Sequence, residues 1–262
     1  MKVLVKLGGT LLDAPESRAR LAAELAAAAK DGVELVVVHG GGKQMTRYLA
    51  ERGIESRFVN GLRVTTPETI DAVLKVFAGS VNHELVSALV AAGARAVGLS
   101  GVDACLAEAE PLDPALGAVG RVVAVNPGLL HLLTENGYVP VVACVAGDRQ
   151  GRVYNVNADQ MAVACAAAFG AGILLFLTDV QGVLNAERAV IPQLTAAECD
   201  GLIAQGIATG GMQAKLNAAS DAVRRGVGQV FIAPGSVSGI VKQAMENQSV
   251  GTRLVLEATA GV

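Results

Sequence analysis

The sequence predicts an α/β fold, a three-layer sandwich in which helices cover both faces of a central, mostly parallel sheet, with β-hairpin insertions. Near-continuous runs of Val, Leu and Ile alternate with Ala-rich stretches of helical length, which is typical of parallel strands buried on both faces. Glycines directly follow the first two apolar runs, where the chain must turn. The 262 residues suit one large domain or two lobes that share a sheet.

The first half of the chain carries most of the regular alternation. It predicts strands over 3–7, 35–38 and 96–99, and helices over 15–30, from the glycines at 40–42 to 51, over 67–76 and over 81–92. Between residues 101 and 154 the pattern changes, because Pro and Gly separate short apolar runs over 106–109 and 120–125. We expect a hairpin-rich insertion there, together with a helix over 126–136 and a buried strand over 139–144.

From residue 155 the alternation resumes. We expect helices over 158–169, 195–205 and 212–225, strands over 173–178 and 229–232, and a hairpin around Asn185. The uncharged segment 161–177 is shorter than the ~20 residues of a membrane span, so we interpret it as a buried helix and strand. A soft boundary near 146–153 divides the chain into an N-terminal lobe, 1–150, and a C-terminal lobe, 151–262, which share one continuous sheet.

Composition argues against several classes of function. The net charge is −3 with scattered basic residues, and aromatic content is 3% without Trp, which argues against a nucleic-acid interface. The four cysteines form no CxxC pair, and we expect buried free thiols in a reducing cytoplasm. The three histidines lack metal-ligand spacing, so we expect no protein metal site. The N-terminal apolar run is too short for an export signal, which favours a cytoplasmic protein without a membrane partner.

Glycines and lysines indicate a phosphate site. Lys6 closes the first apolar run and precedes Gly8-Gly9, while Gly40–Gly42 follow the second run. Glycine N–H groups can approach a phosphate closely because no Cβ intervenes, and a following helix adds a positive end. Lys215 follows another glycine pair at a helix start, and Asp159 begins a helix within Asn155-Val156-Asn157-Ala158-Asp159. Asp159 is thus an anion that the fold could bring to both lysines.

The predicted sheet gathers these residues at one rim. Ligands of doubly wound sheets bind at the carboxyl ends of the strands. We expect such ends to carry Lys6, Gly8-Gly9, Gly40–Gly42, Asn155 and Thr178-Asp179. Phosphoryl transfer requires cations and N–H groups aimed at the transferred group, since that group shares negative charge.

Three other glycine motifs do not match. His39-Gly40-Gly41-Gly42 is also found as an oxyanion loop in α/β-hydrolases, but the nearest nucleophile elbow, Gly98-Leu99-Ser100-Gly101-Val102, lacks its final glycine. The P-loop pattern fails because Val37 replaces its first glycine and Gln44 follows Lys43. The dinucleotide pattern fails because Gly8-Gly9 is followed by Thr10-Leu11.

Several blocks carry a resemblance to a known family: KLGG at Lys6, HGGG at His39, NGLRVT at Asn60, NVNAD at Asn155, LTDVQGVL at Leu177 and TGGMQAKLNAA at Thr209. With them the sequence resembles the amino acid kinase family over essentially the whole chain. Within this family, the blocks NGLRVT and NVNAD together resemble those of the members that phosphorylate N-acetyl-L-glutamate. The resemblance implies an ATP-dependent kinase that acts on the γ-carboxylate of this acceptor and yields an acyl phosphate for arginine biosynthesis.

The resemblance also implies roles for individual residues. Lys6 and Lys215 would flank the transferred phosphoryl group as catalytic residues, and Asp159 would hold both lysines. The N-terminal lobe would bind the acceptor through Gly41, Gly42, Arg63 and Asn155, with Gly8, Gly9 and Gly40 at the phosphate. The C-terminal lobe would bind ATP, with Mg²⁺ carried by the nucleotide, through Asp179, Val180, Gly182, Val183, Leu184, Ile207, Thr209 and Gly211.

Alternatives remain open at this point. A carboxylate acceptor with a pKa of ~4.3 needs no base at neutral pH, so we expect His39 to be structural. Other acceptors would make the chain a carrier-linked aminoadipate kinase, a uridylate kinase or a carbamate kinase, and a non-catalytic acetylglutamate- or arginine-binding module is the alternative outside enzymes. Arg63 with Asn155 favours a compact acid, and the lysines with Asp159 favour an enzyme.

The candidate residues also have purely structural interpretations. Asp159 could be a helix cap, Lys215 and Arg63 could be solvated charges, and Gly8-Gly9 could be a plain turn. Family members inhibited by arginine carry an additional N-terminal helix and form hexamers. Here the first strand begins at Lys2, so the resemblance implies a homodimer without arginine feedback.

Overall fold

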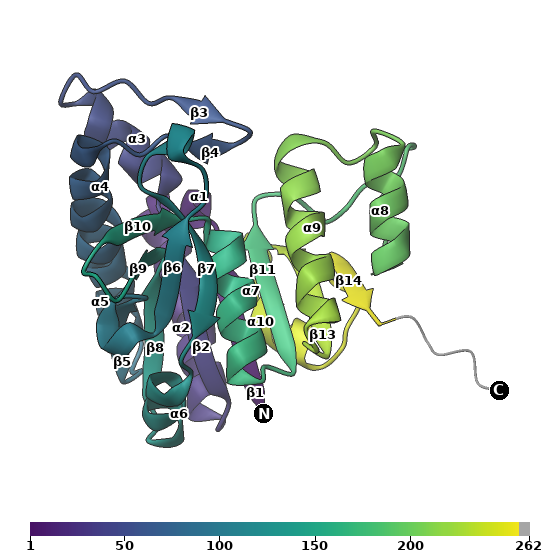
Figure 1. The fold of residues 1–262 in the computed structure, drawn as a ribbon. Coiled ribbons are helices and arrows are strands. Elements are labelled where there is room, and N and C mark those ends of the chain that lie inside the picture. Colours follow the sequence, from purple (N-terminus) through teal and green to yellow (C-terminus); the bar gives the residue numbers. More distant parts are fainter. Residues whose placement is uncertain (257–262) are drawn as a thin grey trace.

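The computed structural model describes residues 1–256 and confirms the predicted three-layer α/β sandwich (Figure 1). Eight strands form the central sheet in the order β12-β14-β13-β11-β1-β2-β8-β5. β14 runs antiparallel to β13, and every other neighbouring pair is parallel. The strands are β1 (Lys2–Leu7), β2 (Glu34–His39), β5 (Ala96–Ser100), β8 (Val139–Ala143), β11 (Ile173–Thr178), β12 (Gln193–Thr195), β13 (Gln229–Pro234) and β14 (Thr252–Val255).

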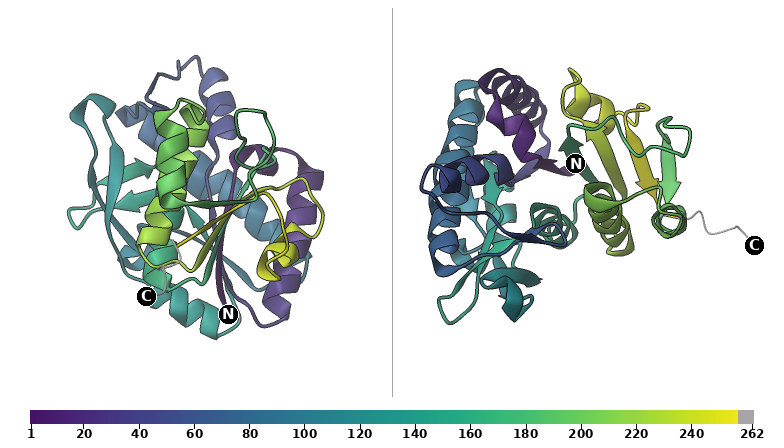
Figure 2. Two further views of the ribbon diagram at one scale, coloured as in Figure 1. Left: turned by 90° about the vertical axis from the view of Figure 1, so that its right-hand side faces the viewer. Right: turned by 90° about the horizontal axis from the view of Figure 1, so that it is seen from above.

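Helices pack on both faces of this sheet. One face carries α6 (Gly128–Glu135), α7 (Ala158–Phe169), α8 (Ala196–Ala204) and α9 (Gly210–Arg224). The other face carries α2 (Pro15–Lys30), α5 (Asn82–Ala91) and α10 (Ile240–Met245). Figure 2 shows both layers edge-on. The buried core lies between these layers and the strands, whose residues are almost all apolar.

The central strand β1 joins the two predicted lobes. It pairs with β2 on one side and with β11 of the C-terminal half on the other, placing Lys6 beside Val38 and Phe176. The sheet therefore runs without interruption between the two halves. Residues 257–262 of the predicted C-terminal lobe lie outside the described residues.

A long helix replaces the two helices predicted over 67–92. It runs from α4 (Pro67–Val73) through a π-helical segment, η1 (Leu74–Val81), into α5. The predicted break is wrong: Gly79 and Ser80 weaken the α-helix, but burial of Val76, Phe77 and Val81 keeps the segment helical. Within residues 1–256 this is the one helix with the length and composition of a membrane span, and it packs on α2, α3 (Gly42–Ala50) and β5.

The insertion is more than a set of hairpins. β6 (Ala107–Pro111), β7 (Val119–Val125), β9 (Val145–Gly147) and β10 (Val153–Val156) close into a small barrel, in which β10 lies parallel to β7. A separate hairpin joins β3 (Phe58–Val59) to β4 (Leu62–Arg63). Its turn residues Asn60 and Gly61 have φ of 49° and 77°, which suits a two-residue hairpin turn.

Several short elements were not predicted. They are α1 (Gly9–Asp13), α10, β12 and β14, and the 3₁₀ turns η2 (Asp103–Cys105) and η3 (Pro114–Leu116). The hairpin expected around Asn185 is present as a bridge between Leu184 and Val190.

Candidate active site

Two lysines from distant parts of the chain meet one carboxylate. Lys6 Nζ on β1 lies 2.7 Å from Asp159 Oδ1, and Lys215 Nζ on α9 lies 3.3 Å from Asp159 Oδ2. Burial raises the pKa of the Asp159 carboxyl, but the positive charges of Lys6 and Lys215 outweigh it, so that the pKa lies below its ordinary value. The carboxylate therefore stays ionised and holds two ammonium groups close together.

The alternative in which Asp159 merely caps α7 is wrong. Asn157 is the N-cap residue of this helix, and its side chain accepts the first backbone N–H groups. Asp159 follows in the first turn, where the positive end of the helix also favours an anion. The side chain of Asp159 is thus free to serve the lysines.

The two glycine turns lie against each other beside this triad. A Cβ on Gly9 would lie 3.2 Å from the backbone nitrogen of Gly42, and one on Gly8 would lie 3.2 Å from Leu177 O. Gly8 N–H donates to that same Leu177 oxygen at 3.0 Å. The close approach of the backbones requires small residues, so Gly8-Gly9 is more than a plain turn.

Arg63 is buried at the end of the β3–β4 hairpin and is not a solvated loop charge. Its guanidinium donates to Thr46 Oγ1 at 2.8 Å, to Gly42 O at 3.1 Å and to Ser56 Oγ. The ring of Phe58 lies 4.6 Å from its Cζ. Burial lowers the pKa of Arg63, but an Arg remains charged. The remaining donors of its five N–H groups are available to an anionic ligand.

A cavity of about 170 Å³ collects all four predicted acceptor residues. Its walls include Gly41, Gly42, Arg63 and Asn155. Apolar side chains complete it, among them Phe77, Val119 and Val156, and the neighbouring residues Asn157 and Ala158 bring the start of α7 to its edge. The cavity thus combines an arginine, an amide, glycine backbone and an apolar wall, which suits a small N-acylated acid.

One detail of the predicted rim is wrong. Asn155 does not follow a strand of the central sheet; it lies in β10 of the barrel, opposite Val119. Its Nδ2 donates to Thr65 Oγ1 at 3.0 Å, and Thr65 in turn donates to Arg63 O at 2.9 Å. The barrel therefore delivers Asn155 to the cavity from outside the sheet, and Thr65 links it to Arg63.

The predicted nucleotide residues lie after β11 and around the start of α9. Val180 and Leu184 are more than a third exposed, at 38% each. Thr209 begins α9 without a side-chain cap for the first N–H groups, Gly210 has φ of 55°, and Gly211 follows in the same turn. The remaining members are Asp179, Gly182, Val183 and Ile207.

Val183 is the buried member of the predicted nucleotide segment. Its side chain is 1% exposed, its N–H donates to Thr252 Oγ1 at 2.8 Å, and its carbonyl accepts from Ile191 at 2.8 Å. The N–H and the carbonyl of Val183 thus each have a partner within the fold, and they fix the nucleotide segment to Thr252 and Ile191.

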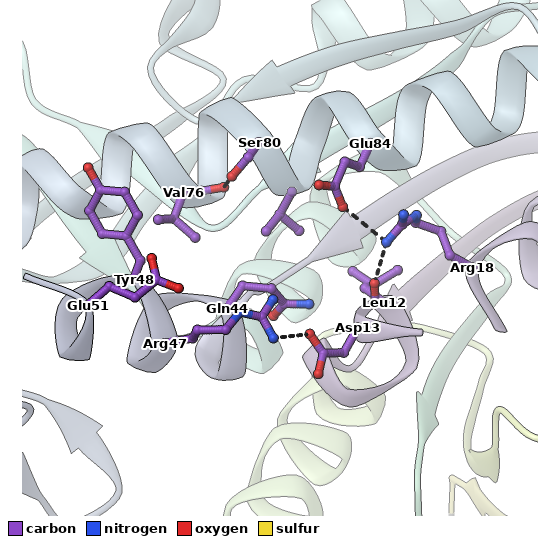
Figure 3. Close-up of a pocket in the computed structure, with 11 residues that line it drawn as sticks. Leu12, Asp13, Arg18, Gln44, Arg47, Tyr48, Glu51, Val76, Ser80 and Glu84 are labelled. Atoms are coloured by element: carbon purple, nitrogen blue, oxygen red, sulfur yellow. Dashed lines mark hydrogen bonds and ion pairs between the residues drawn. The ribbon is translucent and has the colours of Figure 1, made fainter. Parts of the chain in front are cut away.

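A second cavity, of about 160 Å³, lies between α3, the segment from α1 to α2, and the long helix (Figure 3). Both of its arginines pair with carboxylates of the same cavity, Arg47 at 3.1 Å from Asp13 and Arg18 at 3.0 Å from Glu84. Gln44 connects it to the glycine turn by donating to Gly9 O at 3.2 Å. Because the cations there are already neutralised, this cavity suits an anionic ligand less well than the one beside Lys6.

The cysteine predictions have mixed outcomes. Cys144, Cys165 and Cys199 are buried free thiols as expected, whereas Cys105 is exposed, because it lies in the 3₁₀ turn η2. Burial raises the pKa of Cys144, beside the cavity, to about 12, so its thiol stays protonated. Within residues 1–256 no group of three His, Cys, Asp or Glu side chains could hold a metal ion.

Three further residues of the site were not anticipated. Thr65 holds Asn155, Phe77 lines the cavity, and Asn82 contacts His39. Thr65 belongs to the quoted block NGLRVT, which offered a signal for it. Phe77 and Asn82 stand in a helix with an ordinary amphipathic pattern, and only the tertiary packing shows their positions.

Comparison with known proteins identifies the family. The model of the amino acid kinase family matches residues 1–234, and the chain belongs to this family. It is 68% identical over 255 residues to the acetylglutamate kinase of Solibacter usitatus (strain Ellin6076), covering 97% of this chain and 99% of the relative. It is 43% identical over 258 residues to the acetylglutamate kinase of Koribacter versatilis (strain Ellin345), covering 97% and 99%.

A solved structure shares the fold over its full length. The crystal structure of smu.665 from Streptococcus mutans UA159 matches with a TM-score of 0.84 and 27% identity, covering 98% of this chain and 99% of that one. Membership of this kinase family implies that the protein uses ATP and a small-molecule substrate.

Proposed function

We propose that this protein phosphorylates the γ-carboxylate of N-acetyl-L-glutamate with ATP, giving N-acetyl-L-glutamyl 5-phosphate for arginine biosynthesis. The observation that carries the proposal is the placement of Lys6 and Lys215 on Asp159 beside a cavity that contains Arg63 and Asn155. Two full-length relatives named acetylglutamate kinase support the same acceptor.

The residues present suit charge stabilisation without a base. The acceptor carboxylate, with a pKa of ~4.3, is ionised at neutral pH. Lys6 and Lys215 would stabilise the charge shared during transfer, while Asp159 keeps their ammonium groups from separating. Glycine N–H groups would orient the phosphoryl group, and Arg63 with Asn155 would bind the acceptor's other carboxylate.

The nucleotide fits the start of α9. The first N–H groups of this helix lack a cap from Thr209, so they are available to phosphate oxygens. Asp179, Val180, Gly182, Leu184, Ile207 and Gly211 would line the remainder. Mg²⁺ would be carried by the ATP phosphates and would reduce their charge, since Asp159 is occupied by two lysines.

An assay of ADP release tests the acceptor directly. Purified protein is given ATP, Mg²⁺ and one of N-acetyl-L-glutamate, L-glutamate, UMP or carbamate. We expect turnover with N-acetyl-L-glutamate alone, and at least a 100-fold loss of kcat in Lys6→Ala, because an electrostatic donor to the transition state is worth about that much. Turnover with UMP or carbamate would favour the related kinases, and an unaffected Lys6→Ala would contradict the assigned role.

The assembly and location rest on the resemblance. We infer a homodimer in the cytoplasm, with no nucleic acid or membrane as partner. Light scattering of the purified protein would give twice the mass of 26.6 kDa for the dimer. A mass equal to one chain at micromolar concentration would contradict it.

A further inference from the structure

His39 and Asn82 form a buried polar pair behind the glycine loop. His39, at the end of β2, is fully buried, and Asn82, the first residue of α5, is 2% exposed. His39 Nδ1 lies 2.9 Å from Gly40 O, and His39 Nε2 lies 2.9 Å from Asn82 Nδ2. The transfer mechanism described above uses neither side chain.

The partners of this pair define its protonation. A carbonyl oxygen can only accept, so Nδ1 carries the hydrogen and donates it to Gly40 O. Asn82 Nδ2 also donates to Val141 O at 2.9 Å, which fixes the amide with its donor toward the imidazole. Nε2 is therefore the acceptor, and the ring is neutral. Burial lowers the pKa of His39 to about 4, in agreement with this arrangement.

The pair fixes the direction of one backbone N–H. Within the described chain no peptide bond is cis, and in a trans peptide the N–H points away from the preceding carbonyl. Since the Gly40 carbonyl faces the imidazole, the Gly41 N–H faces away from it. Gly41 lines the acceptor cavity.

The long helix contacts the same glycine loop a second time. A Cβ on Gly41 would lie 2.8 Å from Phe77 Cδ1 and 3.3 Å from Val81 Cγ2, both of which belong to the π-helical segment η1. That segment leads directly into Asn82. π-Helical segments occur frequently at functional sites. This one brings Phe77 and Val81 to Gly41, and the residue that follows it, Asn82, contacts His39 at the start of the same turn.

We propose that His39 and Asn82 are positioning residues, which hold the Gly40–Gly41 peptide so that the Gly41 N–H faces the reacting carboxylate and phosphoryl group. The inference deepens the proposed function and rests on it. The long helix acts as a brace for the loop, with Asn82 keeping the tautomer of His39 and Phe77 and Val81 keeping the position of Gly41.

Two substitutions of His39 separate its two hydrogen bonds. The amide nitrogen of Asn occupies the position of Nδ1, so His39→Asn can keep the bond to Gly40 O while it loses the bond to Asn82. The amide of Gln reaches the position of Nε2, so His39→Gln can keep the bond to Asn82 while it loses the bond to Gly40 O. If the pair contributed only to stability, the kcat values of the two variants would not differ.

The expected result is a difference in kcat. We expect His39→Gln to lose about 10- to 100-fold in kcat, since one misdirected oxyanion donor costs up to about that much, and His39→Asn to stay within about 5-fold of wild type. The KM for ATP should change little in both. Equal kcat values in the two variants, or a loss that follows the fall in Tm alone, would overturn the proposal.

A control variant and an NMR measurement complete the test. Thr134→Val is the control, because it removes a buried side-chain hydrogen bond elsewhere, from Thr134 Oγ1 to Leu130 O at 2.9 Å on α6. It should lower Tm without this kcat pattern. ¹⁵N NMR of the wild-type imidazole should show hydrogen on Nδ1 at pH 7, and hydrogen on Nε2 would overturn the proposal even if the variants do not fold. An inactive wild type would contradict the proposed function and leave the tautomer result valid.

Discussion

The side chain of Asn157 holds the backbone of Asp159: its Oδ1 accepts the Asp159 N–H at 2.9 Å and the Gln160 N–H at 3.2 Å. Two residues at the start of α7 thus have different roles. Asn157 caps the helix by accepting two N–H groups that have no partner within it, and the carboxylate of Asp159 binds the two lysines. Because different side chains perform these tasks, each can be removed separately.

Replacing Asp159 by Asn removes the charge and keeps the shape. The ammonium groups of Lys6 and Lys215 would then repel each other beside a neutral amide. We expect Asp159→Asn to lose at least about 100-fold in kcat, with a lower Tm, because a buried charge pair has lost one partner. Steady-state kinetics and thermal unfolding would measure both, and near-normal turnover would contradict the arrangement of the triad.

Replacing Asn157 by Ala removes the cap. We expect a stability loss of about 1 kcal/mol and a lower kcat, since the start of α7 positions Asp159. Thr195→Ala is the matched control, because Thr195 caps α8 with a capping box away from the cavity. Urea unfolding should show similar losses in both variants, and an equal loss of kcat in both would show that the α7 cap has no special importance for the site.

Substitutions of Arg63 should act on the acceptor and spare ATP. Arg63→Ala and Arg63→Lys both lose the planar fork, and Lys cannot replace its bidentate geometry. We expect the KM for N-acetyl-L-glutamate to rise by about 10-fold or more, because a charge-assisted hydrogen bond contributes roughly 1.5–3 kcal/mol. Initial rates at varied acceptor and ATP would show this, whereas an increase confined to the KM for ATP would place Arg63 elsewhere.

Gly41 should tolerate a methyl group only when Phe77 is smaller. The φ of Gly41 is −176°, which any residue adopts, so the contact with the Phe77 ring is the obstacle. We expect Gly41→Ala to lose about 1–3 kcal/mol by overpacking, together with activity. In a Phe77→Leu background the same change should cost much less. A double-mutant cycle without coupling would contradict the proposed contact.

His39 should make the protein sensitive to moderate acid. Its pKa falls from 6.5 in the unfolded chain to about 4 in the fold, so the folded state binds fewer protons between these values. The full stability is therefore present above pH 6.5 and decreases as the pH falls toward 4, by up to about 3 kcal/mol. Urea unfolding at a series of pH values should show a shallower decrease in His39→Asn, and parallel curves would contradict the pKa.

The sequence could predict the sheet and much of its rim for physical reasons. Apolar runs of strand length have few alternatives to a buried parallel sheet, and parallel strands place their carboxyl ends together. That rule brought Lys6 and the glycine turns to one place. The same rule placed the carboxylate of Asp159 within reach of Lys6. The sequence did not show that Asn157, and not Asp159, caps α7, because that depends on the local backbone conformation.

Non-local packing accounts for the parts that were missed. Asn155 lies in the barrel because β10 pairs with β7 and β9, and no local pattern specifies such pairings. The break predicted near Gly79 followed helix propensity, which burial of Phe77 and Val81 overrides.

The separate barrel has a consequence for how this architecture can change. Lys6 stands in the middle of the eight-stranded sheet, whereas Asn155 stands in a four-stranded unit that closes on itself. Substitutions that reshape the barrel can therefore move Asn155 while the register around Lys6 is untouched. Changes at this wall of the cavity can accumulate in the barrel, whereas Lys6, Asp159 and Lys215 stand outside it on β1, α7 and α9.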